Sequence, residues 1–93
     1  MSGVAQCFAE NLASARKGAG VTQEELAFRA ALHRTEIGLL ERGERVPRID
    51  TLIKLASALG VEVEELLTGL IWQPGDFQPG AFEISIRKVA PAG

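Results

Sequence analysis

The side chains with distinctive chemistry gather between residues 33 and 48, where arginines and a threonine lie close together in the sequence. A guanidinium group donates up to five hydrogen bonds in a planar fork, which suits phosphate oxygens and the acceptor edge of a base. Residues 16–48 contain seven Arg or Lys and five Glu, a net charge of +2, whereas the whole 93-residue chain has a net charge of −2. We therefore expect one basic face on a mildly acidic protein.

The sequence offers little for catalysis, because it contains no evident nucleophile–base pair, metal-ligand cluster or phosphate-binding loop. There is one histidine, His33, and one cysteine, Cys7, so neither a metal site nor an intrachain disulfide is expected. Cys7 falls in an apolar helical pattern, which favours a buried small side chain over a redox sensor or an intermolecular bridge. We predict that the protein is not an enzyme, binds no cofactor and has no evident small-molecule effector.

Composition favours a single small folded domain. Apolar residues make up 46% of the chain, which is typical of a soluble globular protein and too high for a disordered one. The longest apolar runs are too short to cross a bilayer, and no leader-like pattern begins the chain. A cytoplasmic protein without a membrane partner is the simplest expectation.

Apolar residues at helical spacing and glycine stops predict five short helices. Thr22 and Glu25 form a capping-box pattern at the start of the second helix. In the third helix, Ile37 and Leu40 are expected to face the core. The expected helices span residues 4–18, 22–29, 33–42, 50–59 and 62–68. This pattern predicts an all-α fold of five helices.

The last quarter of the chain changes character after two Pro-Gly pairs. Residues 81–88 alternate apolar and polar side chains, which predicts a strand. A lone strand leaves backbone groups unpaired, so three arrangements stay open: a hairpin with residues 70–73, pairing or packing against a second chain, or a loose tail. Pairing between subunits would make the segment a dimerisation device, with the aromatic and apolar anchors Trp72, Phe82, Ile84 and Ile86; Phe77 would be a further core or interface anchor.

Taken together, the motif positions resemble the Cro/repressor-type (xenobiotic-response-element type) helix-turn-helix family. The matching residues cover the turn between two helices and the helices after it. They are Thr22, Gln23, Leu26, Ala27, Leu32, Ile37, Glu41, Gly43, Pro47, Leu52, Leu55, Ala56, Leu59, Gly60, Val61, Leu66 and Leu67.

The resemblance implies a lambda-repressor-like domain at about residues 1–69, with residues 70–93 as an extension. It further implies a two-fold dimer bound to double-stranded operator DNA, with the third helix in the major groove.

The resemblance also implies which residues meet DNA bases. Arg34 is the best candidate, because its guanidinium can bind guanine through two hydrogen bonds; a solvated or phosphate-bound arginine is the alternative. Thr35 suits a base edge or a thymine methyl. His33 replaces the usual Ser or Thr cap, so either a DNA contact or a structural role is open. Gly38 clears space near the bases or avoids a clash. Leu39, off the core stripe, touches thymine methyls or is simply exposed.

The remaining functional positions are expected to contact phosphate or to hold the fold together. Gln23 begins the second helix, where the family commonly contacts a phosphate or steadies a base reader. Arg42, Arg45 and Arg48 surround the loop after the third helix, where the family meets the DNA backbone; solvated side chains are the alternative in both cases. The family often pairs positions 16 and 41, so Arg16 and Glu41 are expected to form a partly buried salt bridge.

These expectations favour a sequence-specific transcriptional regulator, acting as a dimeric repressor that occupies a promoter. Antitoxin-type and phage-type regulators are variants of this hypothesis. The alternative is a protein-interaction module that kept the fold and uses the acidic fifth helix and the tail. The arginines at positions 34, 42, 45 and 48 favour DNA, since an interaction module has little reason to collect them.

Overall fold

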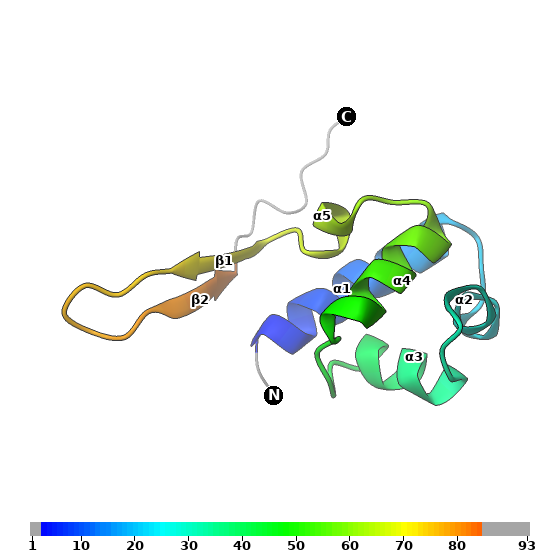
Figure 1. Cartoon of the computed structure of the whole chain (residues 1–93), viewed down its shortest axis with the longest axis horizontal. Helices are drawn as coiled ribbons and strands as arrows, with labels where there is room; N and C mark the ends of the chain where they lie inside the picture. The colour runs from blue at the N-terminus through cyan, green and yellow to red at the C-terminus, as the bar shows by residue number, and fades with distance from the viewer. Residues whose placement is uncertain (1–2, 85–93) are drawn as a thin grey trace.

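The computed structural model describes residues 3–84, which form five helices and one two-stranded hairpin. Figure 1 shows the helices gathered together and the hairpin extending away from them. The elements are α1 (Gly3–Gly18), α2 (Gln23–Ala30), α3 (Arg34–Glu41), α4 (Ile49–Leu59), α5 (Val63–Leu66), β1 (Leu70–Gln73) and β2 (Ala81–Ile84). The predicted five-helix fold is confirmed, although α5 is shorter than expected.

Local contacts define both ends of α2. The N–H of Glu25 donates to Thr22 Oγ1 at 3.0 Å, and the N–H of Thr22 donates to Glu25 Oε1 at 2.7 Å, which confirms the capping box. At the other end of α2, Ala31 adopts a left-handed conformation with φ of 55°. Because the chain reverses within a few residues there, α2 and α3 pack directly against each other.

The core lies where the apolar stripes of the helices meet. The stripe positions Leu26, Ile37, Leu40 and Leu55 are fully buried, as the helical spacing predicts. Cys7 is also buried, which confirms its assignment as a small core side chain. The largest side chains with almost no exposure are Phe8, Leu12, Leu26, Ile37, Leu40, Leu55 and Leu66. Their burial holds α3 firmly, so its outer face is presented on a rigid base.

Of the three arrangements for the C-terminal segment, the intrachain hairpin is the one observed. β1 and β2 pair antiparallel, with Trp72 opposite Phe82 and Leu70 opposite Ile84. The rings of Trp72 and Phe82 meet edge to face, with centroids 5.1 Å apart. Phe77 is fully exposed in the connecting loop, so its predicted role as a core anchor within the chain is wrong. Residues 85–88, including Ile86, lie outside the described residues.

The base of the hairpin is tied to α1 through Asn11. Its side-chain amide donates to the backbone carbonyls of Thr68 at 2.8 Å and Leu66 at 3.0 Å. These carbonyls lie at the end of α5 and two residues after it, where helical partners run out. The hairpin also contacts α1 through β2, so its direction relative to the helices is fixed at two places. Among the described residues, no helix is long and apolar enough to cross a membrane.

Asn11→Ala should lower the free energy of unfolding by about 1–3 kcal/mol, because two carbonyls lose their donor. Urea denaturation followed by circular dichroism measures this change. Ser14→Ala, on an exposed position of the same helix, is the matched control. Equal midpoints for the two variants would contradict a structural role for Asn11.

Candidate nucleic-acid interface

The outer face of α3 and the start of α2 enclose a shallow hollow. Its lining combines a helix cap, two guanidinium groups, a hydroxyl and an amide. The lining residues are Gln23, His33, Arg34, Thr35, Gly38 and Arg42. Sequence reasoning singled out all six as DNA contacts, and the fold brings them together.

His33 caps α3 in spite of its unusual side chain. Its Nδ1 accepts a hydrogen bond from the backbone N–H of Thr35 at 3.2 Å. Nδ1 acts as the acceptor, so the neutral ring carries its hydrogen on Nε2. The imidazole therefore caps the helix and still has one donor to offer to a base or a phosphate. The two roles that the sequence left open are compatible.

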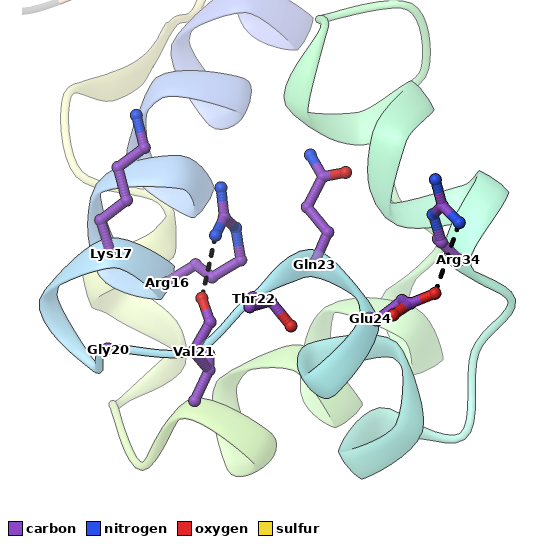
Figure 2. A pocket seen from close by; sticks show the side chains of 8 residues that line it. All are labelled: Arg16, Lys17, Gly20, Val21, Thr22, Gln23, Glu24 and Arg34. Carbon is purple, nitrogen blue, oxygen red and sulfur yellow. Dashed lines mark hydrogen bonds and ion pairs between the residues drawn. The ribbon is translucent and has the colours of Figure 1, made fainter.

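Arg34 and Thr35 begin α3, and both are exposed. The Arg34 side chain is 66% exposed, and its Nη1 lies 3.4 Å from Glu24 Oε2; Figure 2 shows the two side chains facing each other. Such exposed ion pairs contribute about 0–1 kcal/mol. Arg34 can therefore leave Glu24 for another partner at little cost.

Two residues of α3 are less exposed than Arg34 and Thr35. Gly38 is buried, and Leu39 is half-buried. Gly38 is covered by the guanidinium of Arg42, since a Cβ atom added at position 38 would lie 2.9 Å from Arg42 Nη1. Leu39 does not line the hollow. Leu39 is therefore not simply exposed, and its contact with thymine methyls stays a prediction.

A network behind the hollow links the first three helices. Arg16 of α1 donates from Nε to Glu41 Oε2 at 2.6 Å and from Nη2 to Glu41 Oε1 at 3.0 Å. Arg16 Nη1 also donates to the carbonyl of Val21 at 2.9 Å, an interaction drawn in Figure 2. The amide of Gln23 donates to Glu41 Oε1 at 2.9 Å. The predicted salt bridge is confirmed, and Gln23 is an additional member that sequence reasoning did not place there.

The charges in this network are largely shielded from water, with side-chain exposures of 13% for Arg16 and 7% for Glu41. The hydrogen bond to Glu41 raises the pKa of Arg16 above its ordinary value. Partial burial opposes that shift, and the charge of Glu41 adds to it. Arg16 therefore stays charged, and its two hydrogen bonds to Glu41 make the network a rigid support for α3.

The three arginines that follow α3 are exposed, and each has an acidic neighbour. Arg42 Nε lies 3.0 Å from Glu44 Oε2, Arg45 Nη1 lies 2.5 Å from Glu36 Oε1, and Arg48 Nη2 lies 3.4 Å from Asp50 Oδ2. Sequence reasoning missed these partners, although two of them lie only two residues away along the chain.

Arg48 occupies the cap position of α4 and makes no side-chain cap bond. A guanidinium group has no acceptor for the free N–H groups of a helix, so it cannot cap them.

Two more cations extend the basic surface on either side of α3. Arg45 and Arg48 line a second hollow, in which Lys54 of α4 also lies. On the other side, Lys17 and Arg34 line the space before α2 (Figure 2). Sequence reasoning named neither lysine. Their positions in the chain gave no motif signal, because the fold alone brings α1 and α4 beside α3.

This arrangement is that of a helix-turn-helix domain, with α2 supporting α3 and the outer face of α3 open to a ligand. The helix-turn-helix family profile matches residues 12–66 of this chain. The chain therefore belongs to the helix-turn-helix family. It is a DNA-binding transcriptional regulator and not an enzyme, as the sequence predicted.

Several named proteins resemble this chain. It is 46% identical over 65 residues to the control protein C.SmaI of Serratia marcescens, covering 70% of this chain and 77% of that protein. It is 35% identical over 57 residues to the cryptic phage CTXphi transcriptional repressor RstR of Vibrio cholerae, covering 61% of this chain and 51% of RstR.

Among solved structures, the restriction-modification controller protein C.AhdI from Aeromonas hydrophila superposes with a TM-score of 0.65 and 39% identity. The alignment covers 67% of this chain and 94% of C.AhdI.

Glu41→Gln should lower the free energy of unfolding by about 3 kcal/mol, because Arg16 keeps its charge but loses its buried counterion. Glu44→Gln removes the exposed partner of Arg42 and should cost less than about 1 kcal/mol. Urea denaturation of both variants gives the comparison. Similar losses in the free energy of unfolding would show that the buried network stabilises the fold no more than an exposed ion pair does.

Proposed function

We propose that this protein binds operator DNA as a homodimer, reads the major groove with α3 and acts as a repressor in the cytoplasm. The convergence of Arg34, Thr35 and His33 around one hollow supports base reading most directly. All three lie at the start of α3, the end that enters the groove first in helix-turn-helix domains. The buried stripe and the Arg16–Glu41 network at the far end of α3 hold the helix in place.

The basic side chains flanking α3 fit the two walls of a groove. On one side, Gln23 and Glu24 begin α2, where the first backbone N–H groups lack helical partners and can donate to a phosphate. Lys17 lies in the same hollow. On the other side, Arg45, Arg48 and Lys54 share a hollow. We assign these groups to the DNA backbone, with α3 between them reading the bases.

Arg34, Arg45 and Arg48 each face an acidic side chain that DNA can replace. Each of these exposed pairs is weak in water, so a phosphate or a guanine edge can take the place of the carboxylate. The displaced acids then lie near the DNA and disfavour nonspecific contact. We infer that Glu24, Glu36 and Asp50 lower the affinity for random DNA more than for the operator.

Dimerisation through residues 70–93 is supported by an apolar groove beside the hairpin. The groove is lined by side chains from α1, the loop before α4, the segment after α5 and both strands. They are Val4, Phe8, Val46, Pro47, Leu52, Leu67, Leu70, Trp72 and Phe82. About half of the surface of Trp72 and Phe82 is exposed, which is a large apolar area for a small domain. A second copy of the chain is the occupant that a two-fold operator requires.

The names of the relatives support a regulatory role close to a promoter. C.SmaI and C.AhdI are control proteins, and RstR is a phage repressor. We propose that residues 1–69 supply the DNA contacts and that residues 70–93 supply the contact between subunits.

Arg34→Ala should relax the preference at one base pair, with a loss of about 1–3 kcal/mol of discrimination. The measurement is selection of bound sequences from a random DNA pool, followed by affinity measurements on single-base variants. Arg45→Ala is the matched control and should weaken all sequences alike, with a salt slope reduced by about 1. An unchanged footprint and unchanged preference for Arg34→Ala would refute base reading by this residue.

Replacing Trp72 and Phe82 together by Ser should lower the dimer fraction in sedimentation equilibrium, because the groove loses its aromatic wall. Phe77→Ser, at the exposed tip of the same hairpin, should leave the dimer fraction unchanged. If both proteins dimerise as the wild type does, the groove is not the subunit contact.

A further inference from the structure

Gly38 lies in the middle of α3, and its backbone does not require glycine. Among the described residues, the glycines with positive φ are Gly20, Gly43, Gly60 and Gly69. At position 38 any residue fits the helical backbone, and alanine would stabilise the helix by about 0.5–1 kcal/mol relative to glycine. The feature that distinguishes Gly38 is the group that covers it.

The covering group is the guanidinium of Arg42, one helical turn further along α3. A Cβ atom at position 38 would lie 2.9 Å from Arg42 Nη1, 3.8 Å from Cζ and 3.9 Å from Nη2. The side chain of Arg42 therefore folds back along the helix and occupies the space that a side chain at position 38 would fill. Glu44 Oε2 holds the guanidinium from the other side, 3.0 Å from Nε.

This position separates Arg42 from the other arginines of the loop. Arg42 lines the same hollow as Arg34 and Thr35, whereas Arg45 and Arg48 line the hollow on the other side. Because Nε is bound by Glu44, the Nη1 and Nη2 groups form the free end of the fork. Two parallel N–H donors match the O6 and N7 acceptors of guanine in the major groove.

We propose that Arg42 is a specificity-determining residue that reads a guanine, and that Gly38 positions it by leaving room for its guanidinium. This inference rests on the proposed function, because it requires α3 to enter the major groove. It replaces the expectation that Arg42 contacts a phosphate. Gly38 acts through Arg42, so substituting it should change base preference without damaging the fold.

The test is a double-mutant cycle with the wild type, Gly38→Ala, Arg42→Ala and the double variant. Each protein is titrated with the DNA sequence selected by the wild type and with its single-base variants. Arg42→Ala should lower the preference for one G·C pair about tenfold, a pair distinct from the one read by Arg34. Gly38→Ala should lower the same preference, and the double variant should show no further loss. Thermal unfolding should show Gly38→Ala to be at least as stable as the wild type.

Three outcomes would overturn the inference. If Gly38→Ala weakens binding equally with arginine or alanine at position 42, the glycine serves close approach of the helix to DNA. If Arg42→Ala weakens all sequences alike, as expected for Arg45→Ala, Arg42 is a phosphate contact. If Arg34→Ala alters base preference and Arg42→Ala does not, this inference fails while the proposed function stands. Failure to select any sequence would contradict both.

Discussion

The hydrogen-bonded network around Glu41 is the interaction on which the rest of the interface depends. One carboxylate receives donors from Arg16 of α1 and Gln23 of α2 while belonging to α3 itself. Apolar packing alone tolerates small rotations of a helix, because it is not directional. A two-bond contact between a guanidinium and a carboxylate fixes distance and angle. The network therefore sets the rotation of α3 about its axis, and with it the direction in which Arg34 and Thr35 point.

Most of the fold could be predicted because its signals are local or periodic. The capping box at Thr22 and the apolar stripe through Ile37 and Leu40 each depend on residues within one or two helical turns. The pairing of Arg16 with Glu41 came only from family resemblance, because its partners are 25 residues apart. The hairpin stayed open between three arrangements, since an alternating strand pattern does not say which strand pairs with it.

The details of the interface were harder to predict because they depend on where long side chains come to lie. Nothing in the sequence places the guanidinium of Arg42 over Gly38, so the glycine was expected only to clear space near the bases or to avoid a clash. The imidazole of His33 was expected to cap poorly, yet its Nδ1 has the reach to bind the N–H of Thr35. Lys17 and Lys54 join the basic surface only because α1 packs against α3 and α4 packs against α2. Side-chain conformation and tertiary proximity are the two kinds of information that the sequence pattern lacks.

The attachment of Asn11 to the carbonyls after α5 has a consequence for the geometry of the DNA target. Because this contact fixes the hairpin to α1, and the Glu41 network fixes α1 to α3, the apolar groove and α3 form one rigid body. In a dimer joined through that groove, the two copies of α3 would be held at one separation and one relative rotation. Such a dimer would bind two half-sites only at a single spacing along the duplex. Inserting one base pair between them would move the second half-site both along and around the helix axis, away from the reading surface.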